Sequence, residues 1–294
     1  MDPVQKALWF VESHLRDSIT LEDIATACEV SPFHLTRAFT ALTGLSLIRY
    51  VRARRLSEAA RLLAHGADNI LDVALDAGYG SHEAFTRAFR DRFGLTPEQL
   101  RAQGHHDNIS LTEAIVMNTT PIPNLAEPRF ETLGPMLFAG LVERYDCESP
   151  VGIAAQWQRL MPWLGNIPKQ VGQVAYGVCY NFDQEGNFDY MSGVEVKDAA
   201  GLPQELKSLQ TAAQQYAVFT HTEHVASIRA TIAAIWGQWF PSSGYRASAA
   251  PTFERYGPEF NGTTGLGGLE IWVPVESGVA QNPASRGQKC HDSL

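Results

Sequence analysis

Two short segments, each introduced by a serine, carry side chains suited to reading a DNA duplex. The first begins at Ser31 and the second at Ser81, and each continues into the sequence Thr-Arg-Ala-Phe. Read as helices, they keep Phe39 and Phe89 on a buried face and turn a mixed polar face outward. The outward side chains are Phe33, His34, Thr36 and Arg37 in the first helix, and His82, Glu83, Thr86, Arg87 and Arg90 in the second.

These side-chain types match the groups that base edges offer in the major groove. The forked guanidinium of Arg37 or Arg87 binds guanine with two hydrogen bonds, and a threonine methyl group contacts thymine. Glu83 is the unusual member, because it either accepts from a cytosine amino group or repels phosphate and lowers affinity. We therefore predict that both outward faces enter major grooves.

A short apolar helix and a tight turn precede each reading helix. Residues 21–30 and 70–79 supply these first helices, with Ala25 and Ala74 in equivalent positions. A helix over 46–65 joins the two pairs, so the pattern predicts two helix-turn-helix units. The arginines in and near this joining helix predict a local phosphate-binding face: Arg37, Arg49, Arg52, Arg54, Arg55 and Arg61.

Composition sets further bounds. The chain has 294 residues, which is enough for two domains with separate cores. Its formal charge is −9, and 19 acidic against 11 basic side chains fall in residues 106–294, so the first part is near neutral. No membrane span or signal peptide is recognisable, which predicts a cytoplasmic, nucleoid-associated protein. We expect no metal, because the four cysteines are scattered: Cys28, Cys147, Cys179 and Cys290. We also expect no cofactor, and the sequence has no Gly-rich phosphate loop.

From residue 127 the hydrophobic period shifts toward two, which indicates strands. The elements come in the order strand, helix, strand, strand, and this order then repeats. The first set is 129–143, 150–164, 173–182 and 188–196, and the second is 214–222, 225–239, 251–257 and 267–275. The predicted fold class is therefore multidomain: an all-α double helix-turn-helix N-terminal domain and an α+β C-terminal domain of duplicated βαββ units. We expect a cleft at the pseudo-twofold axis of these units.

A carboxylate and aromatic rings are predicted to line that cleft. If Ile271 and Val273 face the helices, Glu270 and Trp272 point the other way, into the cleft. A partly buried carboxylate beside aromatic faces attracts a cation by charge and by cation–π contact. Glu254 is the second candidate acid. The other candidate ligand-binding residues are Tyr256, Trp157, Tyr176, Tyr180 and Trp239, with Phe188, Tyr190 and Trp163 as further wall residues.

Three motifs in the first hundred residues point to one family. They are Ala74-x-x-x-Gly78-Tyr79, the helix from Ser81 to Phe89, and Phe93-Gly94-Leu95-Thr96-Pro97. With them, residues 4–103 resemble the AraC/XylS-type DNA-binding domain. The resemblance implies seven helices in two helix-turn-helix units joined by a long helix. It also assigns DNA reading to both recognition helices, here at Phe33, Thr36 and Arg37 and at Glu83, Thr86 and Arg87.

The second half carries motifs of a different family. They include Phe219-x-His221, Ile235-Trp236-x-x-Trp239, Pro251 to Tyr256, and Leu269 to Val275. With them, residues 127–276 resemble the GyrI-like effector-binding domain of multidrug-sensing regulators. The resemblance implies an aromatic cup with a buried acid that binds lipophilic, often cationic compounds, and it places that acid at Glu270, with Glu254 as the second candidate.

We therefore predict a sequence-specific DNA-binding transcription regulator rather than an enzyme. Its predicted parts are a DNA-binding domain (1–103), a linker (104–126), an effector domain (127–276) and a flexible tail (277–294). Its predicted partners are double-stranded operator DNA, a small lipophilic, cationic effector and RNA polymerase, with no membrane. Two alternatives stay open at this point. One is a GyrI-like hydrolase tethered to DNA, with Glu254, Glu270 and Tyr256 in acid/base roles, and the other is a regulator controlled by protein contact.

Overall fold

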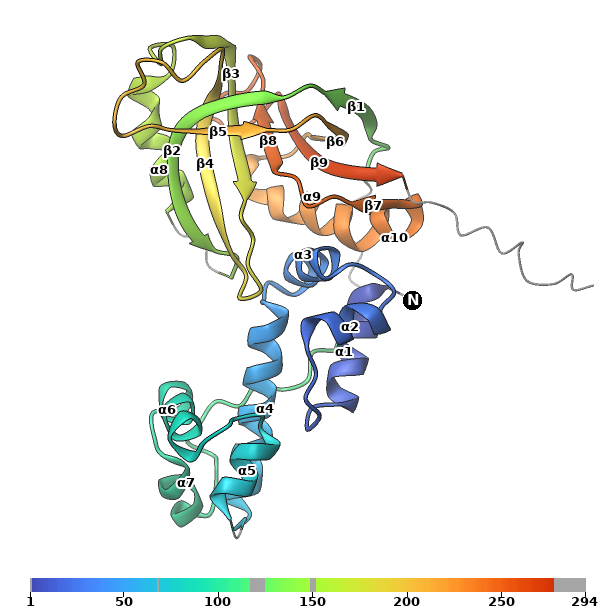
Figure 1. The fold of residues 1–294 in the computed structure, drawn as a ribbon, viewed down its shortest axis with the longest axis vertical. Coiled ribbons are helices and arrows are strands. Elements are labelled where there is room, and N and C mark those ends of the chain that lie inside the picture. The colour runs from blue at the N-terminus through green and yellow to red at the C-terminus, as the bar shows by residue number, and fades with distance from the viewer. Residues whose placement is uncertain (1, 68, 117–124, 149–151, 278–294) are drawn as a thin grey trace, which may run out of the picture.

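The computed structural model describes residues 2–67, 69–116, 125–148 and 152–277, and its helices come first (Figure 1). Helix α4 joins two small bundles, with α1 to α3 near its start and α5 to α7 near its end. The predicted double helix-turn-helix is thereby confirmed. The helices of this half are α1 (Pro3–Ser13), α2 (Leu21–Ala27), α3 (Pro32–Thr43), α4 (Leu47–Ala64), α5 (Ile70–Asp76), α6 (His82–Phe93) and α7 (Pro97–Gln103).

The two reading helices, α3 and α6, begin and end with the same capping residues. Ser31 and Ser81 each accept a hydrogen bond from a backbone N–H in the first turn of the helix that follows. Gly44 and Gly94 end these helices with φ values of 73° and 77°. This left-handed conformation favours glycine, which has no Cβ to clash with the backbone. The repeated sequence therefore gives two helices with equivalent starts and ends.

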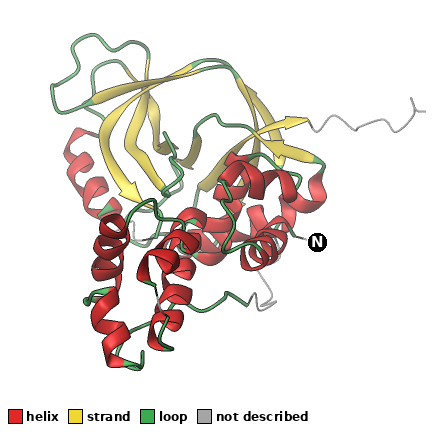
Figure 2. Cartoon of the chain, turned by 60° about the horizontal axis from the view of Figure 1, so that its bottom comes forward, coloured by secondary structure: helices red, strands yellow, loops and turns green. Residues whose placement is uncertain are grey.

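The second half is one curled antiparallel sheet with helices packed against it (Figure 2). Its first repeat contains β1 (Arg129–Leu133), β2 (Met136–Asp146), α8 (Ile153–Leu160), η1 (Met161–Trp163), β3 (Gln170–Tyr180) and β4 (Asn187–Val196). Its second contains β5 (Lys207–Thr211), β6 (Gln214–His221), η2 (Val225–Ser227), α9 (Ile228–Ala234), the π-helical turn η3 (Ile235–Trp239), α10 (Phe240–Ser243), β7 (Tyr245–Ala247), β8 (Thr252–Tyr256) and β9 (Leu269–Ser277).

The strand order displays the predicted duplication. Strands β3 and β8 pair at the centre of the sheet, and the order outward is β4, β2, β5 on one side and β9, β6, β1 on the other. Strands β2, β3 and β4 of the first repeat thus correspond to β6, β8 and β9 of the second. The seam between β3 and β8 marks the pseudo-twofold axis, and there Gly177 lies directly opposite Glu254.

Three local features differ from the sequence expectation. The predicted strand 129–143 is two strands, because the chain breaks at Gly134 and Pro135 before β2 begins. Strands β5 and β7 were not predicted, since they are five and three residues long and pair along one side only. Such short strands are held by their partner's backbone and lack the alternating apolar pattern that identifies a strand in a sequence.

One hydrophobic cluster crosses the boundary between the two halves. It joins Phe39 of α3 to Phe219 of β6, Trp236 of η3 and Ile271 of β9. A second cluster, around Phe85, stays within the second helix-turn-helix unit. The chain is long enough for two separate cores, but the first helix-turn-helix unit shares its core with the sheet half.

The described part of the predicted linker is packed along α4. The backbone N–H of Thr112 donates to Ser57 Oγ at 2.8 Å, and that of Ile115 donates to Tyr50 Oη at 3.2 Å. Arg54 also donates to the carbonyl of Thr112 at 2.9 Å. Residues 112–115 are thus held against α4 by hydrogen bonds. The tail predicted to be flexible lies, apart from Ser277, outside the described residues.

Trp236 offers a test of the shared core, because it is 2% exposed at the junction. We expect Trp236→Ala to cost about 3–5 kcal/mol in the free energy of unfolding, the usual cost of emptying a buried aromatic site. Trp9→Ala is the matched control, since Trp9 is 68% exposed and its loss should cost no more than about 0.5 kcal/mol. Urea denaturation of both variants measures the difference, and equal costs would contradict a shared core.

Candidate functional site

Helix α6 presents an open polar face to solvent. Glu83, Arg87 and Arg90 are exposed along it. His82, at its first position, lies 2.9 Å from Glu98 of α7, so part of its polar surface is already used within the domain. The second reading face is therefore accessible in this structure, with Arg87 and Arg90 as its cations.

Helix α3, the first reading helix, lies instead against the sheet half (Figure 1). His34 is buried with its ring 5.3 Å from that of Trp236 and 5.1 Å from that of Phe240. Thr36 is also buried, and Phe33 meets Phe182 edge-on at 6.3 Å. The predicted outward face of α3 is therefore covered, and the two reading helices differ in access although their sequences match.

Arg37 reaches furthest into this contact. Its guanidinium carbon lies 4.0 Å from the ring centre of Phe182 and 5.5 Å from that of Trp236. Its Nε atom is enclosed with no hydrogen-bond partner among the described residues. Burial lowers the pKa of Arg37 from its ordinary value, although the group stays charged at neutral pH. The aromatic rings of the sheet half thus hold a cation that belongs to the DNA-reading helix.

The arginines of α4 do not form the predicted phosphate-binding face. Arg54 is paired with Glu12 and Glu58, and Arg61 with Glu58 and Glu113. Arg55 donates to two backbone carbonyls, those of Leu15 and Asp17. Arg49 and Arg52 face an acidic group on the sheet half, formed by Asp146, Glu148 and Glu185. The prediction was wrong because a sequence gives the number of arginines and not the partners that the fold brings to them.

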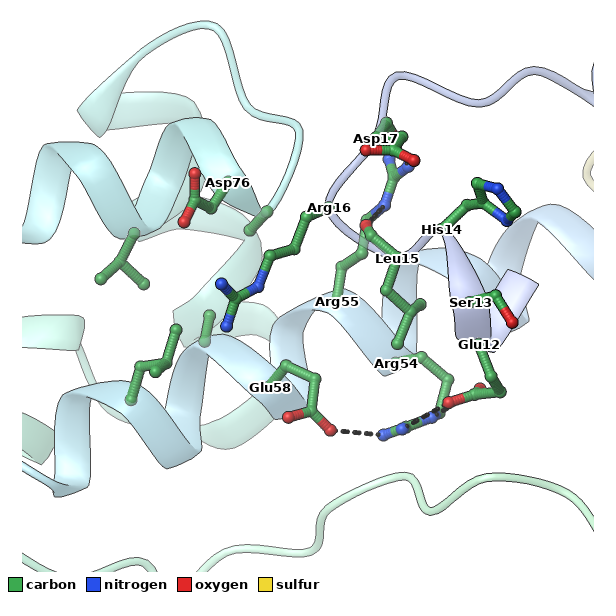
Figure 3. A pocket seen from close by; sticks show the side chains of 14 residues that line it. Glu12, Ser13, His14, Leu15, Arg16, Asp17, Arg54, Arg55, Glu58 and Asp76 are labelled. Atoms are coloured by element: carbon green, nitrogen blue, oxygen red, sulfur yellow. Dashed lines mark hydrogen bonds and ion pairs between the residues drawn. The ribbon is translucent and has the colours of Figure 1, made fainter. Parts of the chain in front are cut away.

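A depression of about 510 Å³ lies between the two helix-turn-helix units, beside α4 (Figure 3). In its wall Arg54 bridges Glu12 and Glu58, and Arg55 donates to two backbone carbonyls. None of its lining residues is Phe, Tyr or Trp. The depression is larger than the cavity described next, but it offers a ligand no wall of Phe, Tyr or Trp side chains.

A connected polar cluster lies at the β3–β8 seam, around Glu254. The hydroxyls of Tyr256 and Tyr190 donate to its Oε2 atom at 2.7 and 2.9 Å. Tyr190 in turn accepts from the indole N–H of Trp157, on α8, at 2.9 Å. Desolvation raises the pKa of Glu254, and the bonds from Tyr256 and Tyr190 offset part of that effect. A carboxylate held in this way gains from any cation that reaches it.

Gly177 makes the cluster possible. A Cβ at this position would lie 2.1 Å from Tyr190 Oη and 2.7 Å from Glu254 Oε2. The glycine therefore leaves room for the hydroxyl and the carboxylate to meet above the seam. Gly177 lies opposite Glu254 across the strand pair, and this pairing could have indicated the cluster, but it was not recognised from the sequence.

A small cavity, about 30 Å³, adjoins Glu254 on the helix side of the sheet. This volume holds one or two water molecules. Glu254 is its acidic lining residue, and Arg37 is its one lining residue from the DNA-reading half. The lining residues are Arg37, Cys179, Ile232, Ile235, Trp236, Thr252, Phe253, Glu254, Ile271 and Val273.

Glu270, the first candidate acid, lies on the opposite face of the sheet. Ile271 and Val273 do pack toward the helices, as the alternation predicted, and Glu270 and Trp272 point away. The cavity, however, is on the helix side. Glu270 is paired with Arg129 at 2.7 Å and Arg255 at 3.3 Å, so its charge is already neutralised.

Most of the predicted aromatic walls pack in the core. Tyr176 and Trp272 belong to the cluster on the face that carries Glu270, with Tyr180 packed against it. Trp239 packs on Phe219 and Phe240. Of the eight candidate ligand-binding residues, the structure brings Glu254, Tyr256 and Trp157 together.

Sequence reading missed Phe182 and Trp236 as contacts for a cation, because their role depends on α3 docking beside them.

The described part of the chain contains no group of three or more His, Cys, Asp or Glu side chains placed to hold a metal ion. Within the same residues, no helix is long and apolar enough to cross a membrane.

Comparisons with known proteins match the helical half and the sheet half of the chain to different families. The sequence model of the GyrI-like small molecule binding domain matches residues 126–276, and that of a helix-turn-helix domain matches residues 24–103. Transcriptional regulator Rob of Salmonella typhimurium is 27% identical over 271 residues, which are 89% of this chain and 92% of that protein. The right origin-binding protein of Escherichia coli K12 is 26% identical over 264 residues, 87% and 90% of the two chains.

Among solved structures, that of SAV2435 bound to tetraphenylphosphonium is similar to the second half. It has a TM-score of 0.45 and 22% identity, and the match covers 51% of this chain and 94% of that one.

The two matched domains and the full-length relatives define a DNA-binding transcription regulator with a small-molecule-binding domain, not an enzyme. The chain belongs to the GyrI-like family, and its first half is an AraC-type double helix-turn-helix.

His34 makes the contact between the halves sensitive to pH. Burial lowers its pKa to about 4, against 6.5 for an exposed histidine. Released His34 therefore binds a proton between pH 6.5 and 4, while docked His34 stays neutral, so the contact should weaken as the pH falls through this window. We expect urea denaturation to show a larger loss of stability from pH 7 to 5 in the wild type than in His34→Phe, and equal losses would contradict this.

Proposed function

We propose that this regulator senses a small lipophilic cation at Glu254. The observation that carries the proposal is a carboxylate with a raised pKa, set among Tyr190, Tyr256 and Trp157 beside a cavity between the sheet and its helices. A cation placed there gains the attraction of the carboxylate and the faces of the aromatic rings at once. A neutral compound of the same shape gains only the apolar contact, so the site favours positive charge.

The output of the proposed sensor is binding to operator DNA. The exposed cations Arg87 and Arg90 of α6 are placed to contact a major groove, and Glu83 gives the face a means of discriminating among bases. We further propose that the regulator acts on nucleoid DNA in the cytoplasm and contacts RNA polymerase there.

The cation site can be tested with 2-naphthamidinium and its neutral analogue 2-naphthamide. Calorimetric titration of the full chain should show tighter binding of the amidinium, because Glu254 attracts its charge. Glu254→Gln should weaken the amidinium about tenfold, the lower end of what a hydrogen bond to a charged group contributes, and should leave the amide unchanged.

Glu270→Gln is the matched control for this experiment. It removes an equivalent charge from the opposite face of the sheet, where two arginines already neutralise it. It should therefore leave amidinium binding nearly unchanged. A larger loss in Glu270→Gln than in Glu254→Gln would return the sensing role to Glu270, and equal binding of amidinium and amide would refute a cation site.

Arg87 is the test of DNA reading by α6. We expect Arg87→Ala to cost about 1–3 kcal/mol of binding free energy at one base pair of the operator and to relax specificity there, as loss of a bidentate base contact does. Binding to a full set of single-base operator variants measures this. A uniform loss across all sequences would instead make Arg87 a phosphate contact.

A further inference from the structure

The face of α3 that is predicted to read DNA forms the contact with the sheet half in this structure. Phe33, His34, Thr36 and Arg37 lie against α9, η3 and the loop that carries Phe182. A recognition helix fills the width of a major groove with this same face. The face cannot contact DNA and the sheet half at the same time, so docking and reading by α3 exclude each other.

The size of the cavity excludes a ligand as well. About 30 Å³ accommodates water, whereas a site for a drug-sized ligand occupies about 300–1,000 Å³. Arg37 is the lining residue that does not belong to the sheet half, and it lies over Phe182 beside Trp236. Release of α3 removes Arg37 from the cavity wall, whereas the other lining residues all belong to the sheet half.

We infer that Arg37 occupies the cation site while α3 is docked. A flat aromatic cation and DNA both favour the state in which α3 is released. This inference rests on the proposed function of Glu254. The guanidinium of Arg37 is itself a planar, delocalised cation on an aromatic ring, so the class of ligand that replaces it has the same character: an amidinium or guanidinium attached to an aromatic group.

The sign of regulation follows from this exclusion. We call the state with α3 released the open state, because its cavity is open and its α3 can reach DNA. A ligand that binds only the open state increases the population of that state. Ligand therefore raises operator affinity, and by linkage DNA raises ligand affinity by the same factor. Release also transfers Arg37 from the aromatic rings to the groove.

Ion pairs beside the docked helix α3 add to the stability of the docked state. Arg49 lies beside Asp146 and Glu148, and Arg52 lies 2.8 Å from Glu185. Pairs at this exposure contribute about 0–1 kcal/mol each and are screened by salt. They align the halves, whereas the apolar contacts of α3 and the position of Arg37 decide whether the ligand site is open.

Hydroxyl-radical footprinting tests the inference directly. The DNA is a site that the full chain selects from a random-sequence pool, and the probe is 2-naphthamidinium. Without the probe we expect protection of one groove segment, by α6. With it we expect protection of two segments about 34 Å apart, and an operator affinity about tenfold higher, within the usual range of allosteric coupling.

Gly237→Leu imitates the ligand without touching the cavity lining. A Cβ at Gly237 would lie 2.6 Å from Cδ2 of Leu42, so a larger side chain pushes α3 away from η3. The variant should bind the operator about tenfold more tightly without probe and lose the response to the probe, while still binding it. Adding Leu42→Ala restores the space, and the double variant should behave like the wild type.

A second variant guards against misfolding of Gly237→Leu. The double change Glu148→Gln and Glu185→Gln removes acids that face Arg49 and Arg52, and it should raise operator affinity in the same direction by a smaller factor. Affinity for non-specific DNA, measured in parallel, corrects for the change in net charge.

The outcomes separate the two proposals. If 2-naphthamidinium binds in calorimetry but neither the footprint nor operator affinity changes, the inference about Arg37 is overturned and the cation site stands. If the probe does not bind while Gly237→Leu still raises affinity, the cation site is refuted and the masking of α3 is supported. Unchanged operator affinity in both variants, with their folding confirmed by circular dichroism, overturns the masking itself.

Discussion

The structure depends on the contact between α3 and the sheet half. A helix-turn-helix needs one face of its second helix for its own core and leaves the other for DNA. Here the second face is also covered, so Phe39 on one side and His34 on the other both pack on apolar groups. The sheet half gains from the same contact, because η3 would otherwise expose Trp236. Each half therefore completes the burial of the other.

This contact breaks the symmetry of a repeated sequence. Helices α3 and α6 share their caps and the Thr-Arg-Ala-Phe sequence, but Arg37 lies on aromatic rings while Arg87 is exposed. Nothing in the repeat itself separates the two arginines. The difference comes from a segment more than 140 residues further along the chain, where Phe182 follows strand β3. Equivalent sequence thus produces two helices that differ in their access to solvent.

The sequence was sufficient for those features that local patterns determine. Ser and Gly at the ends of α3 and α6, and alternation along β9, predicted the elements and their faces. The candidate site was harder, because alternation along one strand does not relate its faces to those of another strand. The register of β8 against β9 places Glu254 opposite Ile271 and so puts Glu254 and Glu270 on different faces of the sheet. The cavity lies on the face of Glu254, and Arg129 and Arg255 neutralise Glu270 on the other. Partners distant in sequence likewise determined the fate of the arginines on α4.

The energetics of the docked state suit a reversible contact. Burial of His34 and Phe33 stabilises docking by removing apolar surface from water, on the order of 25 cal/mol per Å². Arg37 opposes it, because its enclosed Nε has given up a hydrogen bond to water and gained none from the described residues, which costs about 1–3 kcal/mol or more for a charged group. The cation–π contact with Phe182 returns only about 0.5–2 kcal/mol of this. A leucine in place of Arg37 would dock without that cost and would hold α3 more firmly. The arginine therefore keeps the docked state shallow enough to be reversed, and it is also the side chain predicted to contact guanine once α3 is free.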